Sequence, residues 1–335
     1  MRIADRDIDN FLKPYVICEC SCNHDGDLAT ALALIEAAKW AGADAVKFQA
    51  YTPDTITLDC NKPDFIIQDG LWKGRTLYEL YKKTYTPFEW FPKIFKQAKK
   101  VGITAFASVF DLSSVDMLDR LGCPAFKIAS MEITDTPLIA YATRRGKPTI
   151  ISTGMASREE IRSAYEACGG KPVAFLHCTS EYPQTVEWSS LQSIVKLREL
   201  LPGVPIGVSD HTPGNLVVPV GGTAMGVAII EKHMKPEGLS DTEDKEFSLD
   251  PESFKSMVKL VQMTHEALQI REQLSNPTRQ LRRSLYAVAD IEKGETFTEA
   301  NVRSIRPGFG LAPKHLPRLL GKKASHNYRR GDRIT

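Results

Sequence analysis

The sequence has little net charge and no long apolar run, and both absences exclude classes of protein. Its 335 residues contain 43 Lys and Arg against 41 Asp and Glu, a formal net charge of +2. This balance argues against a chain built mainly to hold nucleic acid or an anionic membrane. The most apolar stretch, residues 215–230, contains one proline and three glycines, so we expect no membrane span. The first ten residues are charged and lack an apolar signal core.

Cysteine is sparse and scattered. The odd number of seven predicts free thiols in a reducing, cytoplasmic setting instead of a disulfide framework. Only Cys18, Cys20 and Cys22 cluster. On one face of a strand they would be about 6.6 Å apart, too far for all three to bind one zinc ion without a bend, and no second cysteine pair completes a site. Buried free thiols are the interpretation that this pattern favours.

Short β-prone runs alternate with longer helical patterns as far as about residue 270. Each expected strand is followed by a helix, and the strands are residues 15–19, 45–49, 104–108, 125–129, 149–152, 173–177, 206–209 and 228–232. Such alternation requires parallel strands with crossovers. Eight units in roughly 260 residues have the size of a (β/α)8 TIM barrel. A doubly wound open sheet is the alternative, but polar residues end every strand, and a barrel brings them to one mouth.

Two other regions depart from this alternation. Residues 51–86 form a polar stretch rich in turn residues and aromatics, and we expect irregular structure there. After residue 270 the helical periodicity stops. The pattern predicts a barrel domain over residues 1–270, a polar, basic linker over 271–283 and a small β-rich domain over 284–335.

Two lysines lie in apolar strands near the predicted mouth. Lys47 and Lys127 are costly to bury unless each meets an anion. A single buried lysine would be a candidate Schiff-base amine, whereas two at one mouth suggest a multiply charged ligand such as a phosphate or a carboxylate. Serines at equivalent strand ends would add hydroxyl donors for a phosphate, and these are Ser108, Ser130, Ser152 and Ser209. The alternative is that each lysine pairs with an acidic residue and each serine caps the next helix.

Two histidines end neighbouring strands. His211 and His233 are therefore able to reach one ion, with Asp210 and Glu231 as further ligands or as acceptors behind them. Two imidazoles with water-completed coordination suit Mn²⁺ or Mg²⁺ better than a structural zinc, and such an ion polarises a carbonyl. Core histidines are the alternative. His24, just past the first strand, is a weaker candidate.

Four further polar residues are candidates for contact with a substrate. Glu19 ends the first strand and would act as a general base on water or as a third metal ligand. Glu132 and Tyr182 follow the fourth and sixth strands, where they would meet a substrate. Arg306 lies in a Pro/Gly loop of the tail, suited to a carboxylate or amide oxygen.

Together these motifs resemble the sialic acid synthase family, which condenses phosphoenolpyruvate with an amino sugar to give a nonulosonic acid. The matching stretches are residues 23–26, 46–49, 126–130, 151–155, 177–179, 209–212 and 231–233. Residues 284–335 resemble the antifreeze-like (SAF) domain of that family. Stretches between residues 50 and 90, and residues 304–311, resemble the branch that makes pseudaminic acid from 2,4-diacetamido-2,4,6-trideoxy-L-altrose. The branches that make N-acetylneuraminic or legionaminic acid are the alternatives.

The resemblance implies a role for each candidate residue. The phosphoenolpyruvate-binding residues would be Lys47, Gln49, Ser108, Lys127, Ser130, Ser152 and Ser209. His211 and His233 would bind a divalent metal, Mn²⁺ or Mg²⁺, and Glu19 would handle the proton of the attacking water. The residues facing the sugar would be Glu132, Tyr182, Asp244 and Arg306. Arg306 would come from the partner subunit, because members of the family form domain-swapped homodimers.

Three rival functions make different predictions. A non-catalytic carbohydrate-binding protein would be indifferent to chelators. A metal-dependent barrel hydrolase would act without phosphoenolpyruvate. A lysine aldolase would form an imine with pyruvate that borohydride traps.

Overall fold

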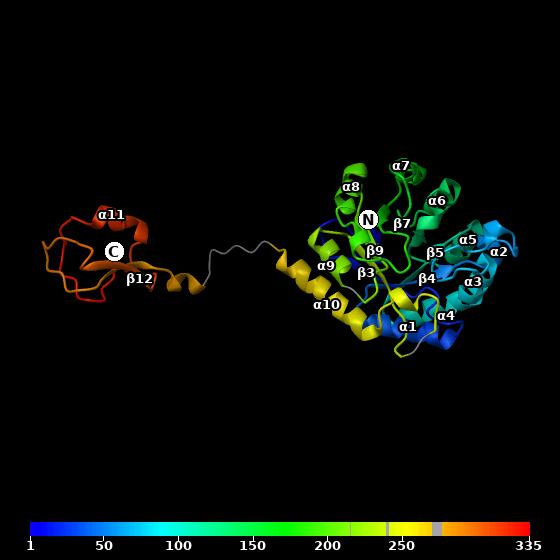
Figure 1. Ribbon diagram of the computed structural model, residues 1–335, viewed down its shortest axis with the longest axis horizontal. Helices are drawn as coiled ribbons and strands as arrows, with labels where there is room; N and C mark the ends of the chain where they lie inside the picture. The colour runs from blue at the N-terminus through cyan, green and yellow to red at the C-terminus, as the bar shows by residue number, and fades with distance from the viewer. Residues whose placement is uncertain (215, 239–240, 270–276) are drawn as a thin grey trace. The chain divides into compact units, whose positions relative to one another are not determined.

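The computed structural model describes all residues except 215, 239–240 and 270–276 (Figure 1). The chain divides into two compact units, Met1–Gln269 and Ile270–Thr335, and each is described by itself. Residues 271–276 of the predicted linker lie outside the described residues.

The first unit is built on a closed barrel of eight parallel strands. The strands are β3 (Tyr15–Glu19), β4 (Ala45–Ala50), β5 (Thr104–Val109), β6 (Phe126–Ile128), β7 (Thr149–Ser152), β8 (Val173–His177), β9 (Ile206–Asp210) and β10 (Ile229–His233). Each strand pairs with the next in the chain, and β10 closes the barrel on β3 with Ile229 opposite Tyr15 and His233 opposite Glu19. The predicted TIM barrel is confirmed, and the open sheet is excluded because such a sheet would leave two unpaired edges.

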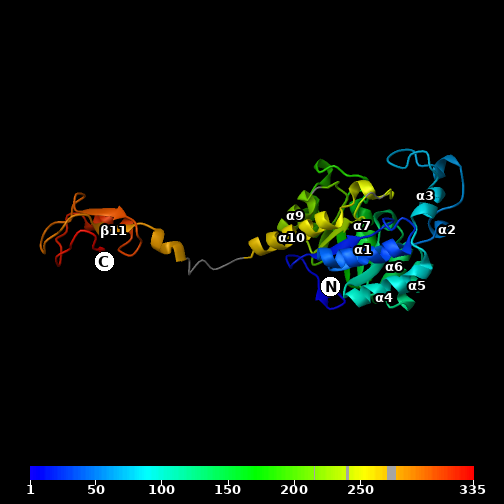
Figure 2. The ribbon, with the colours of Figure 1, turned by 90° about the horizontal axis from the view of Figure 1, so that it is seen from below.

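The helices of this unit surround the strands (Figures 1 and 2). Those between and after the strands are α1 (Leu28–Ala41), α4 (Phe91–Val101), α5 (Leu112–Arg120), α6 (Thr136–Thr143), α7 (Arg158–Ala167), α8 (Ser193–Leu200), α9 (Val217–Ala224) and α10 (Pro251–Ala267). The first of them shows how the sequence sets their ends. The Asp27 side chain accepts from the Thr30 amide at the start of α1, and Gly42, with φ +88°, ends the helix in a left-handed conformation.

The segment between β4 and α4 is more ordered than the sequence predicts. Instead of irregular structure throughout, it contains α2 (Pro53–Ile56), η1 (Pro63–Phe65) and α3 (Leu77–Thr84), with η2 (Phe88–Trp90) leading into α4. Thr76 and Glu79 form a capping box at the start of α3. A Ser/Thr-x-x-Glu signature is readable in the sequence, so this helix was predictable and the expectation of an irregular stretch is wrong there.

The second unit has a small core of its own. Two short antiparallel strands, β11 (Ser284–Ala287) and β12 (Val302–Ile305), pair with Ser284 opposite Ile305. The core residues are Leu285, Ala287, Ile291, Phe297, Val302, Ala324, Tyr328 and Ile334. The remaining elements are η7 (Pro277–Leu281), η8 (Pro313–His315) and α11 (Leu316–Leu319).

A two-residue hairpin, β1 (Arg2–Ile3) with β2 (Arg6–Asp7), precedes the barrel. Three 3-10 turns, η3 (Ser130–Glu132), η4 (Glu187–Ser189) and η5 (Lys245–Phe247), lie in loops that follow barrel strands. Among the described residues, no helix is both long and apolar enough to cross a bilayer.

Candidate active site

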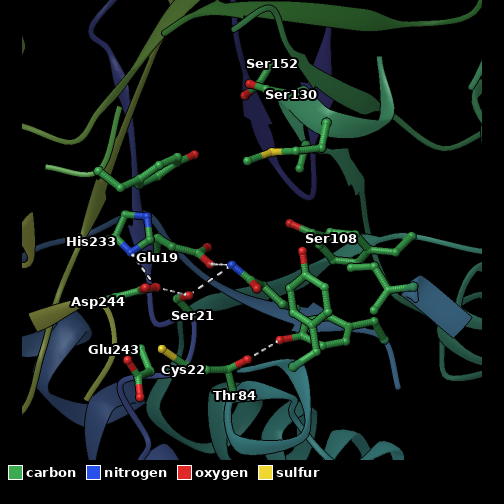
Figure 3. Close-up of a pocket in the computed structure, with 18 of the residues that line it drawn as sticks. Glu19, Ser21, Cys22, Thr84, Ser108, Ser130, Ser152, His233, Glu243 and Asp244 are labelled. Carbon is green, nitrogen blue, oxygen red and sulfur yellow. Dashed lines mark hydrogen bonds and ion pairs between the residues drawn. The ribbon is translucent and has the colours of Figure 1, made fainter. Parts of the chain in front are cut away.

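A cavity of about 490 Å³ lies where the barrel strands end (Figure 3). Most candidate residues of the first unit line it, namely Glu19, Lys47, Gln49, Ser108, Lys127, Ser130, Glu132, Ser152, Tyr182, Ser209, His211, His233 and Asp244. The carboxyl ends of parallel barrel strands meet at one mouth, which explains how residues from all eight strand ends reach one space.

The floor of the cavity holds a buried cluster of two lysines and two glutamates. The Lys47 ammonium lies 2.6 Å from a Glu19 oxygen and 3.6 Å from a Glu231 oxygen. Lys127 lies 3.8 Å from the other Glu231 oxygen. All four residues are at most 3% exposed, so each charge is compensated as burial requires. A carboxylate of the protein therefore lies beside each lysine, and both lysines also line the cavity, where a bound anion would meet them.

The two lysines differ in their electrostatic surroundings. Burial lowers the pKa of Lys127, and the attraction of Glu231 does not fully offset it. Burial also lowers the pKa of Lys47, but Glu19 and Glu231 together outweigh it and raise that pKa above its ordinary value. Lys47 therefore stays charged at neutral pH.

Serine hydroxyls stand beside both ammonium groups. Lys47 donates to the Ser108 hydroxyl at 3.0 Å, and Lys127 donates to that of Ser152 at 2.7 Å. Ser209 donates to Glu231 at 2.9 Å. The set combines cations with hydroxyl donors, which is the chemistry that binds a phosphate or carboxylate.

Ser130 closes this side of the cavity. Its hydroxyl accepts from the Gly154 amide at 3.1 Å and lies 3.1 Å from the Cys178 sulfur. A Cβ at Gly154 would stand 2.3 Å from the Ser180 hydroxyl oxygen and 2.8 Å from that of Ser130, so a larger residue there would displace these side chains.

A hydrogen-bonded chain runs from Glu19 to the other side of the cavity. The Gln49 amide donates to Glu19 at 3.0 Å and to the Ser21 hydroxyl at 3.0 Å, and Ser21 donates to Asp244 (Figure 3). Burial raises the pKa of Glu19 above its ordinary value, against the pull of Lys47. Burial raises the pKa of Asp244 to about 6. Asp244 is thus suited to proton exchange near neutral pH.

The two candidate histidines face one another, with ring centroids 5.4 Å apart. Burial lowers the pKa of His211 to about 4 and that of His233 well below its ordinary value, so both rings are neutral. His211 Nδ1 lies 3.2 Å from the Thr179 carbonyl oxygen. Because a carbonyl only accepts, the proton is on Nδ1 and the lone pair of the neutral ring is on Nε2.

These histidines fit a divalent metal in part. His233 Nδ1 is buried with no hydrogen-bond partner among the described residues. A nitrogen of a neutral imidazole that has no such partner is a suitable metal ligand. Asp244 is the nearest carboxylate, 3.6 Å from that nitrogen. The described residues contain no group of three His, Cys, Asp or Glu arranged around one ion, so any metal here would take its other ligands from water or substrate.

One wall of the cavity is apolar and comes from the segment between β4 and α4. Its side chains are Tyr51, Ile56, Ile67, Trp72, Leu77, Leu80 and Tyr81. The loop after β10 is tied to this segment through Glu243, which lies 2.6 Å from Arg75 and 2.8 Å from Lys83. The cavity is therefore charged at the strand ends and apolar on one side.

Comparisons with known proteins fit this arrangement. The model of the NeuB family matches residues 34–273. The chain belongs to the NeuB family. The SAF domain model matches residues 282–335 of this NeuB chain. These two matches confirm the predicted family and the predicted barrel and SAF architecture.

Three relatives of this NeuB chain span most of its length. A pseudaminic acid synthase of Campylobacter jejuni is 44% identical, covering 100% of this chain and 98% of its own. A pseudaminic acid synthase of Helicobacter pylori is 42% identical, covering 93% and 94%. The solved N-acetylneuraminic acid synthetase of Leptospira borgpetersenii has a TM-score of 0.72 at 28% identity, covering 83% of this chain and 93% of that one.

Several expectations for the NeuB barrel need correction. Asp210 does not face the cavity: it lies 2.8 Å from the Lys232 ammonium, and both side chains are fully buried away from the cavity. His24 packs against Trp90 with ring centroids 5.3 Å apart and lies outside the cavity lining. Strand β3 ends at Glu19, so the three clustered cysteines do not share one strand face.

Sequence reasoning missed the central role of Glu231. The sequence indicates it only as a further metal ligand or as an acceptor behind the histidines, whereas it lies between the two lysines. Strand alternation is the signal that would have found it, because residues two apart face the same side. Glu231 therefore shares a face with His233, while Lys232 faces away.

Glu132 in this NeuB chain gives a prediction on stability. Burial raises its pKa to about 7, against the pull of Lys127, and its Oε2 has no hydrogen-bond partner among the described residues. The folded chain thus holds a proton that the unfolded chain releases between about pH 4.5 and 7, and the contribution of Glu132 to stability falls as the pH rises through that window. Glu132→Gln should raise the free energy of unfolding by about 2–3 kcal/mol at pH 8 and by close to zero at pH 4.5.

Urea unfolding at the two pH values measures this difference. Glu160→Gln is the matched control, since hydrogen bonding to Ser157 lowers the pKa of Glu160, and this variant should gain nothing at pH 8. An equal gain in both variants, or a gain in Glu132→Gln that does not change with pH, would contradict the prediction.

Proposed function

We propose that the protein condenses phosphoenolpyruvate with 2,4-diacetamido-2,4,6-trideoxy-L-altrose, releasing phosphate and forming pseudaminic acid. The observation that carries the proposal is the pair of buried lysines with their serines, Lys47 with Ser108 and Lys127 with Ser152, at the mouth of a NeuB-family barrel. The full-length identity of 44% to a pseudaminic acid synthase supports this acceptor over other amino sugars.

The reaction makes one C–C bond and exchanges one C–O bond, because the carbon that loses its bond to phosphate gains one to water. The enol carbon of phosphoenolpyruvate attacks the aldehyde carbon of the open-chain sugar, whose oxygen takes up a proton. Water adds to the adjacent oxygen-bearing carbon and loses a proton, and the resulting tetrahedral species expels phosphate by C–O cleavage. Lys47 and Lys127 would hold the phosphate and carboxylate and neutralise the charge that leaves. Glu19 would take the proton of the water, held in place by the Gln49 amide 3.0 Å away.

A divalent cation is the cofactor that these residues suggest. His211 and His233 would hold Mn²⁺ or Mg²⁺, which when bound supplies Lewis-acid polarisation of the aldehyde oxygen. The neutral state of both imidazoles supports this assignment, because a protonated ring cannot ligate.

The remaining candidates would serve the acceptor. Glu132, Tyr182 and Asp244 lie around the cavity between the charged floor and the apolar wall. The acceptor carries three methyl groups, two on acetamido groups and one at C6, and apolar side chains of residues 51–81 suit them. Arg306 is exposed on the second unit, in a loop where the Gly310 amide donates to the buried Ser284 hydroxyl. Its arrival from the partner of a domain-swapped homodimer stays a prediction.

Phosphate release tests the function directly. With phosphoenolpyruvate and Mn²⁺, we expect release with the altrose acceptor at least about tenfold faster than with its legionaminic counterpart or N-acetylmannosamine, because a misplaced methyl in an apolar site costs about 10- to 200-fold. Coupled assay of phosphate and mass spectrometry of the product measure this. Preference for another sugar would overturn the acceptor and keep the chemistry. No release with any of the three would overturn the reaction and favour a carbohydrate-binding protein.

A further inference from the structure

We propose that Asn23 is a positioning residue that sets the acceptor side of the cavity by holding the segment 241–249. It follows β3, in one of the stretches that resemble the family, and it does not line the cavity. The inference rests on the proposed function in one respect, since Asp244 on that segment is a candidate sugar-binding residue.

Asn23 is completely buried and its side-chain amide is fully engaged. Its Nδ2 group donates to the Met234 carbonyl at 3.0 Å and to the Ser248 hydroxyl at 2.8 Å, and its Oδ1 accepts from the Thr242 hydroxyl at 2.6 Å. An amide offers two donors and an acceptor in fixed directions. One side chain therefore joins the end of β10 to both sides of Asp244.

The hydrogen bonds continue from Asn23 to Asp244. The Ser248 hydroxyl, which accepts from Asn23, donates to the Asp244 carbonyl at 2.6 Å. The turn that contains Asn23 also carries Ser21, which donates to the Asp244 carboxylate. Both the backbone and the side chain of Asp244 are thus held by the turn after β3, as Figure 3 shows for Ser21.

The same segment carries Phe247, whose ring packs against three rings that line the cavity. The Phe247 ring lies 4.9 Å from that of His233, 5.9 Å from that of His211 and 5.3 Å from that of Tyr182, measured between centroids. Loss of the Asn23 contacts would release Asp244 and Phe247 together. The lysines and serines proposed to bind phosphoenolpyruvate lie on strands β4 to β7 and β9 and in the turn after β6, and Asn23 hydrogen-bonds to none of them. The expected effect therefore falls on the acceptor and spares phosphoenolpyruvate.

A matched pair of variants at Thr242 tests the inference without disturbing Asn23 itself. Thr242→Val keeps the side-chain shape and removes the hydroxyl that Asn23 accepts from, whereas Thr242→Ser keeps the hydroxyl. We expect Thr242→Val to raise the KM of the acceptor about tenfold, the size of one lost buried hydrogen bond, with the KM of phosphoenolpyruvate within about twofold of wild type. Thr242→Ser should retain wild-type constants. Equal rises in both KM values, or the same rise in both variants, would overturn the proposal.

Hydrogen exchange adds a readout that needs no catalysis. In Asn23→Ala, which loses all three contacts, amides of residues 241–249 should exchange at least about tenfold faster than in wild type. Thr143→Val is the control, because it removes a buried hydroxyl that donates to Ile139 within α6, and it should leave that segment unchanged. If the amides of residues 241–249 exchange as slowly in Asn23→Ala as in wild type, the positioning role is refuted. Wild-type protein that releases no phosphate would instead refute the proposed function.

Discussion

Replacing Lys47 by methionine is expected to raise the KM of phosphoenolpyruvate by about two to three orders of magnitude. The substitution removes one of the two ammonium groups that face the cavity, and a charge-assisted contact to phosphate or carboxylate is among the strongest available. It also leaves Glu19, 2.6 Å away, as a buried carboxylate without its cation. An unpaired buried charge repels an anionic substrate as well as destabilising the fold.

Lys232→Met separates these two consequences. Lys232 is as buried as Lys47 and is likewise paired with a carboxylate, that of Asp210 at 2.8 Å, but it faces away from the cavity. Both variants should lower the melting temperature. Only Lys47→Met should weaken the binding of phosphoenolpyruvate, measured as KM and by calorimetric titration. Equal KM values in the two variants would show that the cavity lysine does not bind the substrate. Borohydride trapping of pyruvate on Lys47 or Lys127 would instead favour a lysine aldolase.

Removal of the divalent metal is expected to lower kcat by at least about a hundredfold, and Mn²⁺ should restore it. Polarisation of a carbonyl by a metal contributes several kcal/mol to a transition state. His233→Ala removes one of the two imidazoles proposed as ligands, so added Mn²⁺ should not rescue that variant. Electron paramagnetic resonance measures Mn²⁺ binding independently of turnover, and we expect one ion per chain in wild type and a loss of at least tenfold in affinity in His233→Ala.

His177→Ala is the control for this experiment. His177 is also a histidine at the end of a barrel strand, but its Nε2 lies 2.8 Å from the Ser189 carbonyl oxygen and it does not line the cavity. It should bind Mn²⁺ like wild type. Chelator-resistant activity, or Mn²⁺ binding that survives in His233→Ala, would show that these two histidines do not form a metal site.

Much of the barrel and its cavity was predictable because the controlling features are local. Alternating β-prone runs and helices determine a parallel closed sheet, and a lysine inside an apolar run such as 45–49 signals an obligatory anion. Glu19, Lys47 and Lys127 are therefore predictable as site residues from the sequence of each strand alone. The pairing of His211 with His233 is predictable because consecutive strands of a (β/α)8 barrel are neighbours.

Contacts that depend on closure of the barrel were not predictable from the sequence. Glu231 meets Lys127 across the barrel, 3.8 Å apart, although strands β10 and β6 are not neighbours. Sequence spacing says nothing of that separation, which depends on barrel diameter and strand stagger. The same applies to Asn23 and Ser248, 225 positions apart in the chain, whose meeting depends on how two loops fold over the mouth.

The apolar wall has a consequence for how this enzyme family diversifies. The groups proposed to bind the anion belong to strands whose register is fixed by closure of the barrel, whereas the apolar wall belongs to one connection between β4 and α4. Mutations in that connection should alter the fit of the proposed sugar without moving a lysine or a serine of the strand ends. The condensation chemistry and the choice of acceptor are therefore separable, and changes confined to this one connection should suffice to alter the acceptor.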